Sequence, residues 1–302
     1  MTAHRICVIA NEKSGQNSRD QEAITRAMDV FGDGAWREEW SPGSDPSDTI
    51  DLAIEKNADL VVAAGGDGTA MAVAAAMVGR DIPFAVLPLG TFNFFTRGLG
   101  LSEVPEEAAE QILGGESHDI HVGMVNGQVF LNNASLGIYP AILKERESVY
   151  KHWGRRRIAA HWSVLKTFLR FRRPMKLTMT SDDETRTLRT ALVFVARSAY
   201  QLEMFGIEGR LAIENDAFAV LVARASTRRT LFQLVWRLTT GSIKEGRDYD
   251  LIKTRRLEID VARRKTLLAF DGEKRREKSP FKFRMSEKPL RIILPKTEDT
   301  TE

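Results

Sequence analysis

The segment Gly65-Gly66-Asp67-Gly68-Thr69 combines small residues with one carboxylate in a pattern that suits phosphate binding. It follows an apolar run, residues 60–64, and precedes an Ala- and Val-rich stretch of helical length. Adjacent glycines let the backbone turn sharply and bring N–H groups close to phosphate oxygens, while the following helix adds the positive end of its dipole. Asp67 alone would repel phosphate, so the loop predicts Mg²⁺ between them. A glycine-rich turn with Asp67 as helix cap fits the same residues.

A second carboxylate, Asp271, ends the apolar run 266–270 and is followed by Gly272. Phosphoryl transfer depends on positioning and charge neutralisation, and a carboxylate near the attacking hydroxyl assists it. The same Asp-Gly pair also suits a plain two-residue hairpin turn. The spacing alone therefore favours the plain turn.

The elements that must carry the first loop alternate between strand and helix. Short apolar runs predict buried strands at 5–10, 60–64 and 84–88. Apolar spacings of three and four predict a helix at 19–31, cap residues predict one from Asp45 or Ser47 to Ile54, and Ala- and Val-rich composition predicts one at 70–78. Such alternation is typical of a parallel sheet covered by helices. We expect an α/β nucleotide-binding domain over residues 1–122.

The pattern changes after Val122 to short β-like segments. They comprise residues 128–132, 176–180, 191–196, 217–222, 256–261, 266–270 and 290–294. We expect an antiparallel, sandwich-like β-rich domain over residues 123–295, with its C-terminal segment packing back on the first domain. The fold class is thus α/β plus all-β, and residues 296–302 are expected to be a disordered tail.

Composition excludes several classes of protein. The 302 residues are 43% hydrophobic and 28% charged, which is the range of folded globular proteins rather than disordered, collagenous or coiled-coil chains. Residues 1–123 carry a net charge of −12 and residues 124–302 one of +15, so the second half favours an anionic partner. The single cysteine, Cys7, excludes an internal disulfide framework. Without a long apolar stretch or signal-like start, we expect a cytoplasmic protein.

Four motifs in order resemble the diacylglycerol and sphingosine kinase superfamily, in particular its bacterial lipid kinases. They are an Asn-x-x-Ser-Gly loop (residues 11–15), the GGDGT loop (65–69), a PLGTxN segment (88–93) and a late Asp-Gly-Glu (271–273). The resemblance covers nearly the whole chain. It implies ATP-dependent transfer of the γ-phosphoryl group to a lipid hydroxyl such as that of diacylglycerol, in a cleft between the two domains.

The same resemblance implies roles for individual residues. Asp67 and Asp271 are the expected catalytic residues, with Asp271 as the base for the acceptor hydroxyl, and Asp67 and Glu273 are expected to hold Mg²⁺. The residues expected to bind ATP are Asn11, Ser14, Gly15, Gly65, Gly66, Gly68, Thr69, Thr91 and Asn93.

The chain departs from the family pattern in three places. Met71 and Ala72 follow GGDGT where the family has Asn-Glu, and Phe92 and Phe94 replace a Gly and an Asp in the PLGTxN segment. The segment 213–220, which includes Ala219, lacks carboxylates expected at a structural Mg²⁺ site. These departures bear on nucleotide and metal handling.

The segment 151–173 contains eight Lys or Arg residues, no acidic residue and several aromatic residues. Such a helix suits an anionic membrane surface, because aromatic rings settle at the headgroup boundary and basic side chains approach the lipid phosphates. The expected membrane contacts are Trp153, Arg155, Arg156, Arg157 and Trp162. A helix that packs between domains with solvated arginines fits equally well. We expect no nucleic-acid partner, since such binding leaves the kinase-like loops unexplained.

Two other functions fit part of the sequence. An NAD kinase shares a GGDG loop before a β-rich domain, although the PLGTxN segment argues against it. A lipid- or nucleotide-binding protein that has lost catalysis would explain the departures, although Asp67, Asp271 and Glu273 persist. Edge strands of the second domain could pair between protomers as a homodimer.

Overall fold

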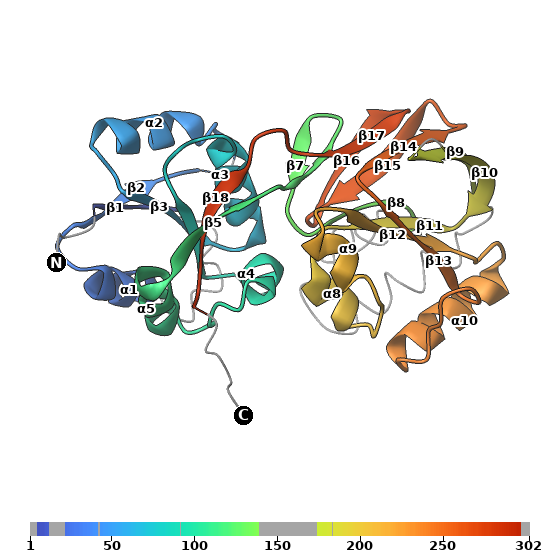
Figure 1. The fold of residues 1–302 in the computed structure, drawn as a ribbon, viewed down its shortest axis with the longest axis horizontal. Coiled ribbons are helices and arrows are strands. Elements are labelled where there is room, and N and C mark those ends of the chain that lie inside the picture. The colour runs from blue at the N-terminus through green and yellow to red at the C-terminus, as the bar shows by residue number, and fades with distance from the viewer. Residues whose placement is uncertain are drawn as a thin grey trace, which may run out of the picture. The chain divides into compact units, whose positions relative to one another are not determined.

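The computed structural model describes residues 5–11, 22–41, 43–90, 92–138, 174–182 and 184–296. The chain divides into two compact units (Figure 1). One contains Met1–Val122 together with Ser286–Glu302, and the other contains Gly123–Met285.

The first unit is built on a six-stranded sheet with the order β2-β1-β3-β4-β18-β5. Its strands are β1 (Ile6–Ala10), β2 (Ala35–Glu39), β3 (Leu60–Gly65), β4 (Phe84–Pro88), β5 (Glu116–Ile120) and β18 (Leu290–Leu294). The pairings are parallel except that of β5 with β18. β1, β3 and β4 are buried at every position, which explains why their sequences are apolar without alternation.

Helices cover both faces of this sheet, with α1 and α5 on one side and α2 and α3 on the other (Figure 1). The helices are α1 (Ala23–Phe31), α2 (Ser47–Glu55), α3 (Asp67–Met77), α4 (Phe94–Gly98) and α5 (Pro105–Gly114). The core on the α1 side joins Ile6 and Val8 of β1 to Phe31 of α1 and Ile112 of α5. The expected parallel α/β architecture is confirmed.

The start of α2 differs in detail from the expected cap. The residue before the helix is Pro46, which has no side-chain hydrogen bond to the first turn. Asp45 supplies that bond from one residue further back, since its Oδ1 accepts the N–H of Ser47 at 2.9 Å. A carboxylate therefore still satisfies a donor at the helix start.

The second unit contains two six-stranded sheets in which the described pairings are antiparallel. One has the order β10-β9-β14-β17-β6-β7 and the other β13-β12-β11-β8-β15-β16. The strands of the first sheet are β6 (Gly123–Val125), β7 (Gln128–Phe130), β9 (Met175–Ser181), β10 (Glu184–Thr190), β14 (Arg256–Val261) and β17 (Phe281–Met285). Those of the second are β8 (Asn133–Gly137), β11 (Leu192–Ala196), β12 (Phe218–Ala223), β13 (Tyr249–Thr254), β15 (Lys265–Phe270) and β16 (Glu273–Lys278).

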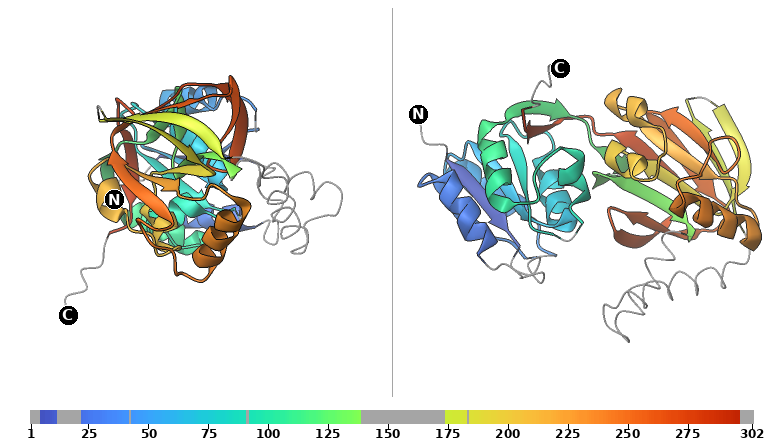
Figure 2. Two further views of the ribbon diagram at one scale, coloured as in Figure 1. Left: turned by 90° about the vertical axis from the view of Figure 1, so that its right-hand side faces the viewer. Right: turned by 90° about the horizontal axis from the view of Figure 1, so that it is seen from below.

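Aromatic side chains join the two sheets of this unit. Phe130 and Phe283 of one sheet contact Phe218 of the other, with ring centroids 5.8 Å and 6.5 Å apart. The unit is therefore a β-sandwich, as expected from its run of short strands (Figure 2).

Three helices lie in the described part of the second unit, namely α8 (Ala199–Glu203), α9 (Arg210–Glu214) and α10 (Arg228–Thr239). One face of α10 packs on the sandwich, because Leu231 and Leu234 form a buried cluster with Ala223 and Ala225. Each helix in the described part of the chain is too short or too polar to span a lipid bilayer.

Candidate functional site

Three loops lie side by side at the carboxyl edge of the sheet in the first unit. Asn11 follows β1, residues 65–69 span the end of β3 and the first turn of α3, and Leu89, Gly90 and Asn93 lie between β4 and α4. β1, β3 and β4 are neighbours in the sheet, so their carboxyl ends are adjacent. Open α/β sheets bind their ligands at this edge. The topology thus brings Asn11 and the two glycine-containing motifs together.

The two glycine loops touch through their backbones at Gly66 and Gly90. A Cβ on Gly90 would lie 2.5 Å from the Cα of Gly66, and a Cβ on Gly66 would lie 3.2 Å from the Cα of Gly90. The N–H of Leu89 also donates to the carbonyl of Gly65 at 2.9 Å. A side chain on Gly90 does not fit this contact, so the glycines serve first to pack one loop against the other.

Asn93 fixes the shape of the second loop from within. Its backbone is left-handed, with φ of 48°, a conformation that Asn tolerates better than most residues. Its Oδ1 accepts the N–H of Gly90 at 2.9 Å, and its Nδ2 donates to the carbonyl of Gly90 at 3.1 Å. The polar groups of Asn93 are therefore engaged within the loop that they shape.

Asp67 connects the first loop to the start of α4. Its Oδ1 accepts the N–H of Phe95 at 3.1 Å. Burial raises the pKa of the Asp67 carboxyl, although the backbone N–H groups of Phe95, Phe94 and Asn93 oppose the rise. Asp67 is also the first residue of α3, where the helix dipole favours a negative charge. The carboxylate is therefore held in position by the protein itself.

Asn11 and Thr69 join the end of β1 to the first turn of α3. The Nδ2 of Asn11 donates to the Oγ1 of Thr69 at 3.3 Å, and both residues are buried. Gly68, the residue before Thr69, is exposed, and a Cβ added to it would have nothing within 4 Å. Among these loop residues, Gly68 leaves the most room for a ligand to approach the backbone.

Phe92 and Phe94, two of the departures from the family pattern, stack on each other. Their ring centroids are 5.5 Å apart and their planes differ by 3°. Phe92 keeps 48% of its surface exposed. The second loop thus presents an apolar face in place of the Gly and Asp of the family pattern.

Asp271 forms a two-residue hairpin turn with Gly272 between β15 and β16. Both have positive φ, 44° and 84°, as the plain turn predicts. The Asp271 carboxylate also accepts three backbone N–H bonds, from Leu131 at 2.5 Å, Asn132 at 2.8 Å and Asn133 at 3.0 Å. The turn therefore does direct a carboxylate inward, against the segment between β7 and β8.

Apart from the adjacent Asn132-Asn133 pair, the sequence gives no sign that residues 131–133 meet Asp271. These residues are buried, and the Oδ1 of Asn132 has no hydrogen-bond partner within the described part of the chain. A buried acceptor without a donor is costly, so Asn132 is a further residue of interest beside Asp271. The adjacent Asn-Asn pair was the one available signal.

Glu273 is exposed at the first position of β16. Within the described ranges, no group of three or more His, Cys, Asp or Glu side chains could hold a metal ion. Asp216, one of the two acids in segment 213–220, pairs with the largely buried side chain of Arg197 at 2.8 Å. Mg²⁺ that arrives with a nucleotide needs only one or two carboxylates, so the donors present fit such an ion better than a permanently bound one.

Several predicted site residues lie outside the described residues. They are Ser14, Gly15, Thr91, Trp153, Arg155, Arg156, Arg157 and Trp162.

Comparison with known proteins assigns both units. The profile of the diacylglycerol kinase catalytic domain matches residues 5–125, and that of the YegS C-terminal NAD kinase β-sandwich-like domain matches residues 143–294. The class is therefore that of diacylglycerol kinase-like proteins, with an α/β unit and a β-sandwich. The chain belongs to the YegS family, in which a diacylglycerol kinase catalytic domain is followed by the YegS C-terminal domain.

Individual relatives agree with this assignment. The "Probable lipid kinase YegS-like" of Pseudomonas fluorescens (strain Pf0-1) is 32% identical over 139 residues, and that of Enterobacter sp. (strain 638) is 33% identical over 143. The matched part spans about half of each curated relative, 45% and 48%, and 45% and 46% of this chain.

Solved structures share the fold over nearly the whole chain. A crystal structure of a diacylglycerol kinase from Bacillus anthracis str. Sterne superposes with a TM-score of 0.67 at 16% identity. A second structure from that organism gives a TM-score of 0.70 at 18% identity. Each comparison covers 97% of this chain and 98% of the other.

Proposed function

We propose that the protein transfers the γ-phosphoryl group of ATP to a hydroxyl of a membrane lipid such as diacylglycerol. The observation that carries the proposal is the contact between the two glycine loops, with Asp67 fixed at their junction by the N–H of Phe95. The named relatives support a lipid rather than a soluble acceptor.

The nucleotide phosphates are proposed to bind at the first turn of α3. The first N–H groups of a helix lack acceptors within the helix, and an anion can accept from them. The exposed Gly68 lets the phosphates approach the backbone of this turn. The proposed nucleotide site comprises Asn11, Ser14, Gly15, Gly65, Gly66, Gly68, Thr69, Thr91 and Asn93. Of these, Asn11, Thr69 and Asn93 act by holding the loops, because their side chains are buried and bonded there.

Asp67 and Glu273 are proposed to hold Mg²⁺, which would neutralise charge on the transferred phosphoryl group. Asp67 suits this role because its position is fixed by α4 and its carboxylate lies in the phosphate loop. A cation beside Asp67 would also offset the burial that raises the pKa of this carboxyl.

Asp271 is proposed to accept the proton of the lipid hydroxyl. Its three bonds to the N–H groups of residues 131–133 hold the carboxylate in one orientation, which general-base catalysis requires. The positive φ of Asp271 and Gly272 fixes the turn that carries it.

A glycine pair tests the nucleotide site without disturbing the fold. At Gly68 and at Gly114, the last residue of α5, an added Cβ would have nothing within 4 Å. Gly68→Ala should weaken ATP binding at least tenfold in titration calorimetry with unchanged thermal stability, and Gly114→Ala should leave both unchanged. Equal ATP affinity of the two variants would refute phosphate binding at this turn.

Transfer itself is tested with labelled γ-phosphate and Mg-ATP. The acceptors are a total lipid extract in vesicles containing phosphatidylglycerol, purified diacylglycerol, and NAD. We expect a labelled lipid with the wild type and none with Asp67→Asn. A labelled NAD product, or no product from protein that binds ATP, would overturn the lipid kinase proposal.

A further inference from the structure

The outward face of α10 exposes two large aromatic side chains. Phe232 and Trp236 lie one turn apart and keep 65% and 63% of their surface exposed. Arg229 shares their face, because it is three residues before Phe232. The opposite face is fixed by Leu231 and Leu234, so the aromatic pair cannot turn inward without unpacking the helix.

The charge around this face is positive. The helix contains no acidic residue, and residues 224–250 hold six Arg or Lys against three Asp or Glu. Arg228 and Arg229 occupy the first turn, where the helix dipole disfavours cations. Arg229 is exposed and has no ion-pair partner among the residues that the structure describes. Helix stability does not account for the exposed Arg229, whereas an anionic partner does.

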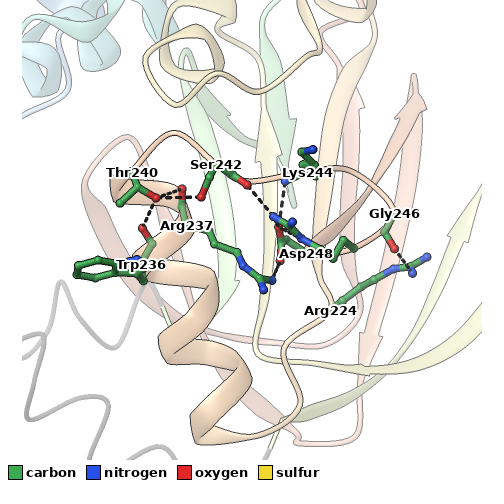
Figure 3. Close-up of polar contacts among 9 residues, drawn as sticks. Arg224, Trp236, Arg237, Thr240, Ser242, Lys244, Gly246 and Asp248 are labelled. Carbon is green, nitrogen blue, oxygen red and sulfur yellow. Dashed lines mark hydrogen bonds and ion pairs between the residues drawn. The ribbon is translucent and has the colours of Figure 1, made fainter.

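The C-terminal end of α10 is braced against the loop that follows (Figure 3). The buried carboxylate of Asp248 accepts from Arg237, from Arg247 and from the N–H of Lys244 at 3.0 Å. Although burial alone would raise the pKa of Asp248, the hydrogen bonds from Arg247, Arg237 and Lys244 hold it below the ordinary value. Asp248 is neutralised by this network, so it does not cancel the positive face of the helix.

A second exposed apolar patch in the same unit has the opposite charge. It contains Met204, Phe205 and Leu211 beside α8 and α9, with exposures of 53%, 42% and 66%. Its acidic neighbours are Glu203, Glu208 and Glu214, and Arg210 pairs with two of them. Of these two patches in the described part of the chain, the α10 face is the one that combines exposed aromatic rings with an excess of cations.

We propose that the α10 face, defined as Arg228, Arg229, Phe232 and Trp236, docks on the surface of an anionic lipid bilayer. The rings of Phe232 and Trp236 enter the boundary between headgroups and acyl chains, and the arginines contact lipid phosphates. The inference rests on the proposed lipid kinase function. We favour a bilayer over a nucleic acid, because single strands are bound along a basic groove, whereas these four residues lie on a single helix.

Vesicle sedimentation with the full chain tests the docking face. The probes are vesicles of phosphatidylcholine with and without phosphatidylglycerol. The double variant Phe232→Ala/Trp236→Ala should lose at least tenfold in partitioning to anionic vesicles, and Arg229→Gln should lose about fivefold, since one basic residue contributes about 1 kcal/mol. Leu211→Ala is the matched control, because Leu211 is equally exposed within an acidic patch, and it should bind like the wild type.

Other occupants of the face give different results. The fluorescence of Trp236 is obtained as the difference between the wild type and Trp236→Phe. If another part of this chain covers the face, acrylamide will fail to quench this fluorescence in the absence of vesicles. If a second copy covers it, sedimentation velocity will show a dimer that the double variant loses. Binding of single-stranded DNA at low salt, without binding of vesicles, would indicate a nucleic-acid partner. Each of these outcomes, or equal vesicle binding by all variants, overturns the docking proposal.

Phosphoryl transfer to a short-chain diacylglycerol dispersed without vesicles separates this inference from the proposed function. The double variant should keep wild-type transfer to the dispersed acceptor and lose it with acceptor in anionic vesicles. Transfer with no vesicle binding by the wild type refutes the docking face alone. Vesicle binding with no transfer to any lipid refutes the proposed function alone.

Discussion

Replacement of Asp271 by alanine should destabilise the second unit as well as affect transfer. The change removes the acceptor of three backbone N–H groups, those of residues 131–133. These three residues are only 3%, 2% and 5% exposed, so water has little access to the released donors. A buried donor left without an acceptor costs about 1–3 kcal/mol.

The low end of that range gives a loss of about 3 kcal/mol for three donors. Alanine also meets backbone strain at the φ of 44°, of about 1–2 kcal/mol. Asp182 supplies a matched control, because it has the same φ of 44° in the two-residue turn between β9 and β10. The Asp182 carboxylate accepts no hydrogen bond within the described ranges. Asp182→Ala therefore introduces the same backbone strain as Asp271→Ala, but it leaves no backbone N–H group of the described residues without its acceptor.

Urea unfolding followed by circular dichroism measures both variants. Asp271→Ala should be less stable than Asp182→Ala by about 3 kcal/mol, which corresponds to a lowering of the melting temperature by about 6–12 °C for a unit of this size. A difference below about 1 kcal/mol would refute the reasoning that the carboxylate holds residues 131–133. Transfer by Asp271→Ala must accordingly be assayed well below its melting temperature.

Three further predictions concern the first unit. Because burial raises the pKa of Asp67, ionisation of this carboxyl lowers the stability of the folded protein. Asp67→Asn should therefore have a higher melting temperature than the wild type at neutral pH. The wild type should regain stability as the pH falls toward the ordinary pKa range of a carboxyl. Asp67→Ala, which leaves the N–H of Phe95 without its acceptor, should melt lower, and differential scanning calorimetry compares them. Burial raises the pKa of the Cys7 thiol to about 12, so Ellman's reagent should label it only on unfolding. Gly90→Ala should cost about 1–3 kcal/mol in urea unfolding, because its Cβ would meet Gly66.

The buried strands of the first unit could be predicted because both of their faces are covered. β1, β3 and β4 therefore need apolar side chains at every position, which is a signal readable without neighbours. β2 and β5 lie at the edges of the sheet, expose much of their surface and contain the polar sequences AWREE and ESHDI. These segments are strands because they pair with β1 and β18, so no pattern in their own sequences predicts them.

In the candidate site, too, some features could be predicted from local sequence and others could not. The glycine loop has a short, local signature that made Asp67 a candidate, whereas Asp271 became one only through the resemblance to the kinase superfamily. The contacts that fix them join residues far apart in the chain, such as Asp67 with Phe95 and Asp271 with Asn132. Such contacts arise only when the sheets form, so spacing along one sequence does not reveal them.

The place of β18 between β4 and β5 affects the order in which the two units can fold during synthesis. β5 joins the sheet through β18, and the strands of the second unit are encoded between these two. At about 5–20 residues per second, a ribosome needs about 10–30 s to pass from the end of β5 to the start of β18. During that time the edge of β4 is open, and the contiguous β-sandwich can fold first. The unit whose synthesis begins earlier is therefore completed later, and its exposed strand edge is the stage at which a nascent chain most needs protection from aggregation.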